Sequence, residues 1–126
     1  MTKEIIQSKN APEAIGPYSQ AVKSGNMVFL SGQIAIDKDS GNIITHDIQL
    51  ETKQVMTNLG HVLTAAGLNF SNVVKCNIYL KNMSDFPKVN EIYGSFFTDA
   101  PPARETVEVS GLPKGVNVEI SCIAVK

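Results

Sequence analysis

The chain has 126 residues, of which 43% are hydrophobic and 18% charged, and we predict one globular domain over residues 1–126. It has no apolar run near the roughly 20 residues that a membrane-spanning helix needs, and its start lacks the apolar core of a signal peptide, so we expect a cytoplasmic protein with no membrane partner. The net charge is −1 and the lysines are scattered singly, which disfavours nucleic acid as a partner.

Along the chain, strand and helix patterns alternate without repeats or linkers. A hairpin is predicted where Ser24-Gly25-Asn26 separates two apolar runs. The first long helix is expected to start at the N-cap Asp47 and to end at Gly67. A second helix is expected to start at the cap Ser84 and to stop at Pro101-Pro102. The predicted elements, in chain order, are a strand over 3–7, the hairpin over 20–31, a helix over 47–67, a strand over 73–81, a helix from 84, and strands over 104–109 and 116–125.

This order of elements predicts the fold class. Two helices that follow strands, with two strands at the end of the chain, are typical of an α+β fold with a single mixed β-sheet and two helices on one face. The last two strands are separated by the turn-rich segment 110–115. Their simplest pairing is a final hairpin.

The cysteines and histidines do not indicate a metal site. Cys76 and Cys122 lie far apart in apolar alternating runs, which predicts buried, reduced thiols. No CxxC, CxxH or HxH spacing occurs. His46 and His61 have no neighbour in the sequence that indicates a catalytic pair.

Side-chain alternation in the predicted strands divides the sheet into two faces. The residues expected to point toward the helices are Val74, Cys76, Ile78 and Leu80, then Val107 and Val109, then Val116, Val118, Ile120, Cys122 and Ala124. This assignment turns Arg104, Thr106 and Glu119 to the outer face. That face also carries Tyr79 and Ile123, which makes it too apolar for bare solvent and predicts an oligomer interface with polar pockets.

Arg104 is the single arginine in a chain with ten lysines, and it follows the stiff pair Pro101-Pro102. Lysine cannot grip a carboxylate with a planar, two-pronged fork, so a single arginine is a candidate anion-binding residue. Two interpretations stay open from the residues alone. Arg104 is either an ordinary surface charge or ion-pair partner, for example of Glu119, or a substrate fork beside Glu119 acting as a general base or water-positioning acid.

Four further residues are weaker candidates for a site. Gly32 after Ser31 would let a backbone N–H approach a ligand closely, Tyr18 offers a phenol on a stiffened loop, and Asn90 lies on the second helix. Each also has an ordinary structural interpretation as a turn, packing or solvated residue. No pattern of a nucleophile–base pair, a phosphate-binding loop or a metal site occurs. Any catalysis is therefore expected to be proton transfer, tautomerisation or water addition on a reactive small acid.

A series of motifs runs along essentially the whole chain. They are Ala11-Pro12, Ile15-Gly16-Pro17-Tyr18-Ser19-Gln20-Ala21, Phe29-Leu30-Ser31-Gly32-Gln33, Gln54-Val55-Met56-Thr57-Asn58-Leu59, Asn90-Glu91-Ile92-Tyr93, Pro102-Ala103-Arg104, and Val118-Glu119-Ile120 with Ala124. In this order they resemble the Rid (YjgF-type) family of reactive-intermediate deaminases, such as 2-iminobutanoate/2-iminopropanoate deaminases.

The resemblance implies a chorismate-mutase-like (YjgF-like) fold in which the strand over 73–81 lies between the last two strands, in place of a final hairpin. It also implies a homotrimer whose outer sheet faces form a central barrel, with active clefts between subunits. The implied activity is hydrolysis of enamines and imines, such as 2-aminoacrylate and 2-iminobutanoate made by pyridoxal-phosphate dehydratases. The implied products are 2-keto acids and ammonia, and no cofactor is implied.

Carried over by motif, Arg104 is expected to hold the substrate carboxylate, helped by the Gly32 backbone N–H. Glu119 is expected to position or activate the attacking water. The remaining cleft residues that the resemblance implies are Tyr18, Ser31, Asn90 and Thr106. Thr106 stands where many relatives have cysteine, so it is expected to act through its backbone.

Other functions attributed to relatives form the alternatives. One is a non-catalytic trimer that binds a small carboxylate, a branch that typically lacks the arginine, so Arg104 argues against it. Another is an endoribonuclease or translation inhibitor, which the absence of a basic stripe disfavours. A holdase chaperone role would use exposed apolar surface, and the sequence does not decide it.

Overall fold

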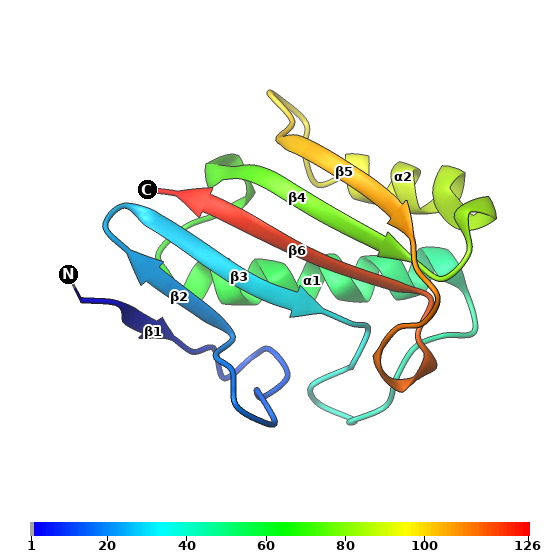
Figure 1. Ribbon diagram of the computed structural model, residues 1–126, viewed down its shortest axis with the longest axis horizontal. Helices are drawn as coiled ribbons and strands as arrows, with labels where there is room; N and C mark the ends of the chain where they lie inside the picture. Colours follow the sequence, from blue (N-terminus) through cyan, green and yellow to red (C-terminus); the bar gives the residue numbers. More distant parts are fainter. Residues whose placement is uncertain (1) are drawn as a thin grey trace.

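The computed structural model describes residues 2–126, which form one six-stranded sheet with two helices on the same side (Figure 1). The strand order is β1-β2-β3-β6-β4-β5, and β4 and β5 are parallel while the other neighbours are antiparallel. The elements are β1 (Glu4–Ile6), β2 (Ala21–Ser24), β3 (Met27–Gln33), α1 (Ile48–Ala65), β4 (Val73–Leu80), α2 (Phe86–Gly94), β5 (Ala103–Glu108) and β6 (Val118–Val125), with short 3₁₀ turns at Phe70–Asn72, Met83–Asp85 and Pro113–Gly115. The predicted α+β class is confirmed.

The long helix α1 forms where the sequence predicts it. Asp47 Oδ1 accepts hydrogen bonds from the backbone N–H groups of Gln49 and Leu50 at 2.9 and 3.0 Å, which caps the helix. Gly67, at φ +76°, turns the chain away after the last residue. Within residues 2–126 neither helix is long and apolar enough to cross a membrane. The apolar stripe packs on the sheet, and its buried members are Val55, Met56, Leu59, Val62 and Leu63.

The start of the second helix differs from the prediction. Ser84 does not cap it, because a 3₁₀ turn over Met83–Asp85 comes first. Asn82 caps this turn instead, with its Oδ1 accepting a hydrogen bond from the backbone N–H of Ser84 at 3.0 Å. Asparagine and serine are both good caps, and the local sequence alone does not choose between them.

The end of α2 also differs from the prediction. The helix stops at Gly94, seven residues before the Pro101-Pro102 pair that was expected to stop it. Phe96 and Phe97 lie beyond the helix and pack on Phe70, with ring centroids 5.3 and 5.5 Å apart. The segment between the helix end and the proline pair makes these aromatic contacts in place of further helical turns.

The sheet order overturns the predicted final hairpin. Ile78 in the middle of β4 pairs with Thr106 of β5 on one side and with Ile120 of β6 on the other. The helix α2 links β4 to β5 as a crossover connection, which is the connection that parallel neighbours require. The order implied by the family resemblance is therefore confirmed.

The inner face of the sheet agrees with the prediction for β6 and, with one exception, for β4. Val118, Ile120, Cys122 and Ala124 are all buried, as are Cys76, Ile78 and Leu80. The exception is Val74, which is 47% exposed while Val73 is buried. The pairing of β4 with β6 shifts register between Val73 and Lys75, and this irregularity reverses the alternation at the start of the strand.

The prediction for β5 is wrong. Arg104 pairs with the buried Cys76, and its side chain lies against α2, so Arg104 and Thr106 belong to the helix side of the sheet. Glu105 and Val107 point to the outer side, where Val107 is 44% exposed. The reason is that β5 is an edge strand, and its register with β4 decides which of its side chains point toward the helices. Val107 and Val109, from which the face was predicted, do not indicate that register.

Candidate functional site

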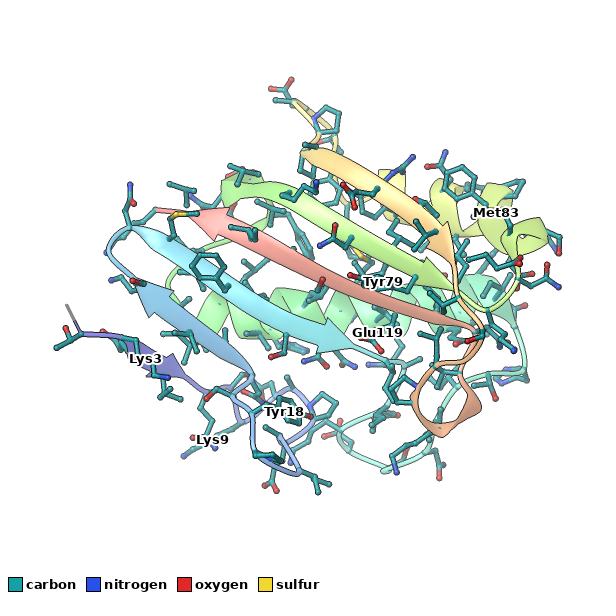
Figure 2. The ribbon with its side chains drawn as sticks, viewed as in Figure 1. Lys3, Lys9, Tyr18, Tyr79, Met83 and Glu119 are labelled. Atoms are coloured by element: carbon teal, nitrogen blue, oxygen red, sulfur yellow. The ribbon has the colours of Figure 1, made fainter. Side chains whose placement is uncertain are left out.

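A pocket of about 590 Å³ opens where the N-terminal loop meets the ends of β3 and β6. Four of the predicted site residues line it, namely Tyr18, Ser31, Gly32 and Glu119. Figure 2 shows Glu119 and Tyr18 on the same side of the molecule, away from the helices. Apolar walls complete the pocket, and they include Pro12, Ile15, Ile34, Ile36 and Pro113.

Gly32 faces Glu119 through a bulge in the sheet. The pairing of β3 with β6 shifts register between Leu30 and Gln33, so Ser31 and Gly32 lie in an irregular stretch. A Cβ atom on Gly32 would collide with the carboxyl group of Glu119 and would lie 2.9 Å from its Cδ. Glycine is therefore required for the carboxyl group to lie this close to the backbone.

Glu119 is half-buried, and this burial affects the ionisation of its carboxyl group. Burial raises the pKa of its carboxyl group above the usual value of 4.5, because the charged form loses solvation. Within residues 2–126 Glu119 makes no ion pair, and in particular none with Arg104. The surface ion pair between these two residues, which the sequence left open, is absent from the described chain.

Ser31 connects the pocket to the loop that carries Tyr18. Its Oγ donates a hydrogen bond to the carbonyl oxygen of Ser19 at 2.6 Å, and its N–H donates to the carbonyl oxygen of Gln20 at 2.9 Å. Tyr18 is 54% exposed at the mouth of the pocket. Ser31 thus fixes the loop, and the phenol of Tyr18 stays accessible to a ligand.

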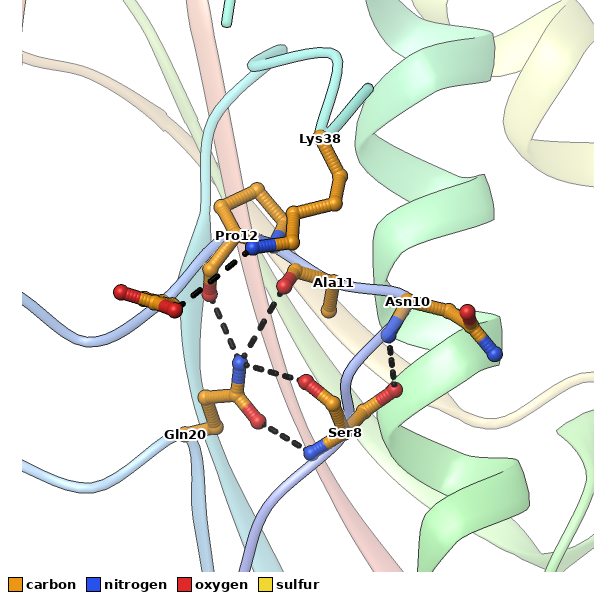
Figure 3. Close-up of polar contacts among 7 residues, drawn as sticks. Ser8, Asn10, Ala11, Pro12, Gln20 and Lys38 are labelled. Atoms are coloured by element: carbon orange, nitrogen blue, oxygen red, sulfur yellow. Dashed lines mark hydrogen bonds and ion pairs between the residues drawn. The ribbon is translucent and has the colours of Figure 1, made fainter.

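Gln20 is a residue to which the sequence analysis gave no role. Its buried side chain accepts a hydrogen bond from Ser8 N–H at 2.6 Å and donates to the carbonyl oxygens of Ser8, Ala11 and Pro12, with the Pro12 bond at 2.7 Å (Figure 3). This one amide closes the segment from residue 8 to residue 20 into a compact wall of the pocket. Its place in the Tyr-Ser-Gln-Ala motif was the available signal.

The other predicted residues gather around Arg104, at the edge of the sheet. Arg104 Nη1 donates a hydrogen bond to Asn90 Oδ1 at 2.6 Å. The guanidinium carbon lies 5.2 Å from the ring centroid of Phe86 and 5.1 Å from that of Tyr93. Asn90 is thus a partner of Arg104 and not only a solvated helix position. Phe86 and Tyr93 of α2 also contact the cation.

Two hydroxyl groups beneath this cluster are buried without a hydrogen-bond partner among the described residues, and they belong to Tyr93 and Thr106. Burial raises the pKa of Tyr93, so its hydroxyl stays protonated. Cys76 and Cys122 pair across β4 and β6 as free thiols, and the neighbouring Cys76 together with burial raises the pKa of Cys122. The predicted buried, reduced cysteines are confirmed.

Comparison with known proteins identifies the group to which these features belong. The family model described as Endoribonuclease L-PSP matches residues 8–126. A mouse protein named 2-iminobutanoate/2-iminopropanoate deaminase is 45% identical over 98% of this chain and 92% of its own length. The chain belongs to this family. It is the Rid (YjgF-type) family that the motifs indicated.

Solved structures of Rid-family proteins share the fold over nearly the whole chain. A protein of the conserved Rid family from Yersinia pestis, 45% identical, superposes with a TM-score of 0.97 and covers 99% of this chain and 100% of its own. The E. coli protein TdcF with bound serine, 39% identical, has a TM-score of 0.94 and covers 98% of each chain.

Within this Rid-family chain, the predicted site is divided into two clusters. Arg104 lies on the helix side of β5, whereas Glu119 lies on the outer side of β6, and β4 separates the two strands. Two strand spacings alone amount to about 10 Å, and the side chains point to opposite sides. One copy of the chain therefore does not present both groups to one small substrate, which corrects the expectation that they share a face.

No third cluster indicates a metal. In the region from residue 2 to residue 126, no group of three or more His, Cys, Asp or Glu side chains is placed to hold an ion.

Proposed function

We propose that this protein hydrolyses reactive 2-enamino and 2-imino acids, such as 2-aminoacrylate and 2-iminobutanoate, to 2-keto acids and ammonia in the cytoplasm. The observation that carries the proposal is the pair of clusters: an arginine fork without a carboxylate partner, and a half-buried glutamate with a raised pKa. The name of the mouse relative supports the same reaction.

The division of the site leads to a proposal on assembly. We propose a homotrimer in which the Arg104 cluster of one copy meets the Glu119 pocket of its neighbour, so that each cleft is complete only between subunits. The outer face and its edges carry exposed apolar side chains that an interface would cover, including Met27, Phe29 and Val107.

In the proposed reaction, the Arg104 fork binds the substrate carboxylate, and the Gly32 N–H donates a second contact. Glu119 accepts a proton from a water molecule while the oxygen of that water adds to the carbon of the C=N bond. That proton passes to nitrogen and gives a carbinolamine. The hydroxyl proton of the carbinolamine is then transferred to nitrogen, the C–N bond breaks, and ammonia leaves a 2-keto acid. An enamine substrate first takes up a proton at its β-carbon and becomes the imine. A carboxylate with a raised pKa is well suited to hold and return this proton.

The other predicted residues have supporting roles in this proposal. Tyr18 lies at the pocket mouth, where its phenol contacts substrate or water, while Ser31 holds the loop that carries it. Asn90 orients Arg104. Thr106 lines the arginine side of the cleft. The reaction requires no cofactor, because an imine is already electrophilic.

The second candidate is a trimer that binds a small carboxylate without turnover. The structure of TdcF with bound serine supports this alternative, because it shows a similar fold holding an amino acid. An endoribonuclease role matches the family description, but the scattered lysines of this chain offer no basic footprint for RNA.

A coupled assay tests the proposed function. A serine or threonine dehydratase generates the enamine in place, and release of 2-keto acid and ammonia is followed with and without the purified protein. We expect acceleration by the wild type and a loss of about 30- to 100-fold in kcat/KM for Arg104→Lys, since a lysine keeps the charge but not the fork. The exposed Lys53→Arg on α1 is the matched control. No acceleration by the wild type would favour the binding-only alternative.

A further inference from the structure

Three side chains of α2 contact Arg104, and all three lie on one stripe of the helix. Phe86, Asn90 and Tyr93 are spaced by four and three residues, which places them above one another on one face. Asn82 and the following 3₁₀ turn set where this short helix begins. The start of α2 thus decides that this stripe, and no other, faces β5.

The contacts use little of the hydrogen-bonding capacity of the guanidinium group. The aromatic rings attract the cation through their π faces, at 5.2 and 5.1 Å. Asn90 accepts one hydrogen bond from Nη1. Arginine has five N–H donors, and no other hydrogen bond from Arg104 to residues 2–126 is present. The Nε and Nη2 donors remain for a ligand.

The charge of Arg104 is also preserved. No carboxylate within the described chain pairs with it, because the two ion pairs there join Lys38 with Glu13 and Lys75 with Glu105. A neutral amide at Asn90 and two aromatic rings hold the cation without neutralising it. A carboxylate in their place would compete with an anionic ligand for the same fork.

We infer that Phe86, Asn90 and Tyr93 are positioning residues that set the orientation of Arg104 and leave its fork unpaired for a ligand carboxylate. The inference rests on the proposed function, since it takes a small carboxylate as the ligand. It goes beyond the role of Arg104, because it makes the strength of carboxylate binding by Arg104 depend on three side chains of α2. Tyr93 acts through its ring, so its buried hydroxyl is dispensable.

Phe86→Leu is the primary test, because leucine keeps an apolar contact but has no π face. Binding of 2-oxobutanoate and of its neutral amide to the intact protein is measured by calorimetry. We expect about 3- to 5-fold weaker binding of the acid, the equivalent of about 0.7–1 kcal/mol for one exposed cation–π contact. The amide should bind with unchanged affinity. Phe86→Tyr and Tyr93→Phe keep the rings and should stay within about twofold of the wild type.

A double-mutant cycle separates positioning from a merely structural effect. In an Arg104→Ala background, Phe86→Leu should change binding of the acid by less than about twofold, because the group that it positions is gone. If Phe86 has a purely structural role, Phe86→Leu would weaken binding of the acid and of the amide alike, in both backgrounds. That result would overturn the inference.

Asn90→Asp provides a second test that does not depend on the core, since Asn90 is exposed. The new carboxylate should pair with Arg104 and weaken binding of the acid by about tenfold or more, while binding of the amide stays unchanged. If Asn90→Asp or Phe86→Leu leaves acid binding unchanged while Arg104→Ala weakens it by a measurable factor, the positioning inference alone is wrong. If Arg104→Ala binds the acid like the wild type, the carboxylate anchor of the proposed function is wrong as well.

Discussion

The Glu119 pocket and the Arg104 cluster are built by different physical means. The pocket is enclosed by backbone, with the loop from residue 8 to residue 20 held by the buried amide of Gln20 and by Ser31. The Arg104 cluster lies on an edge strand and is held by stacking and one side-chain hydrogen bond. The Glu119 carboxyl group therefore lies against backbone in a pocket, whereas Arg104 is exposed on the edge of the sheet.

This difference indicates a division of tasks. Positioning a proton acceptor needs a rigid, partly desolvated environment, and the bulge at Gly32 supplies it. Binding a carboxylate needs an exposed, unpaired fork, and an edge strand supplies that. Each region lacks what the other provides, so the comparison can be tested by disabling one region at a time.

The largest effect is expected from Glu119→Gln. The amide keeps the size of the side chain but cannot accept the proton, so kcat should fall by about 10²- to 10⁴-fold while KM changes little. The coupled dehydratase assay measures both constants. A large rise in KM with an unchanged kcat would show that Glu119 binds substrate instead, and the division of tasks would be wrong.

Mixing two inactive variants tests whether the two regions meet between copies. If the protein is unfolded and refolded from equal amounts of Arg104→Ala and Glu119→Gln chains, the proposed trimer predicts that about one quarter of the clefts combine an intact arginine with an intact glutamate. We expect a matching fraction of wild-type activity from the mixture and none from either variant refolded alone. Absence of any recovery would place both groups in the same copy.

Gly32→Ala should disturb the pocket and leave the Arg104 cluster intact. The new Cβ would collide with the Glu119 carboxyl group, so we expect a loss of about 1–3 kcal/mol in the free energy of unfolding, or displacement of the glutamate with loss of activity. Urea unfolding and the coupled assay distinguish the two results. Gly111→Ala, at an exposed glycine that like Gly32 has no positive φ but has open space around it, controls for the added methyl group without a collision.

The smallest effect is expected in the pH dependence. Because burial raises the pKa of Glu119, kcat should rise with pH as the carboxyl group loses its proton and fall as the pH drops through that raised value. The inflection should lie above 4.5, the usual value for a glutamate. Arg104→Lys should keep this inflection, whereas any residual activity of Glu119→Gln should lack it.

Much of the fold could be predicted from local patterns. The cap Asp47 and the approximate bounds of α1 were predicted directly, because capping and helix termination depend on neighbouring residues. The inner row of β6 was also correct, since a central strand covered by helices alternates cleanly. The edge strand β5 was assigned to the wrong face, because neither side of an edge strand is fully covered and its alternation carries little information.

The site residues were predicted to share one cleft, whereas one copy of the chain divides them between the Glu119 pocket and the Arg104 cluster. One pocket is lined by Tyr18, Ser31, Gly32 and Glu119. The sequence analysis expected Gly32 to admit a ligand, and the structure shows that it also makes room for the carboxyl group of Glu119. Gln20 received no role, since its importance comes from bonds to residues up to twelve positions away. The roles assigned to these residues stay predictions until the variants are measured.

The sequence by itself determined the fold class, the family and the presence of one arginine fork, because composition, spacing and motifs are properties of the chain. The tertiary structure confirmed the family-implied order in which β4 lies between β5 and β6, and it decided that Arg104 and Glu119 lie on different sides of the sheet. The physical reason is register: which strands pair, and at which residue, depends on contacts between distant segments, and a shift of one position reverses every side chain.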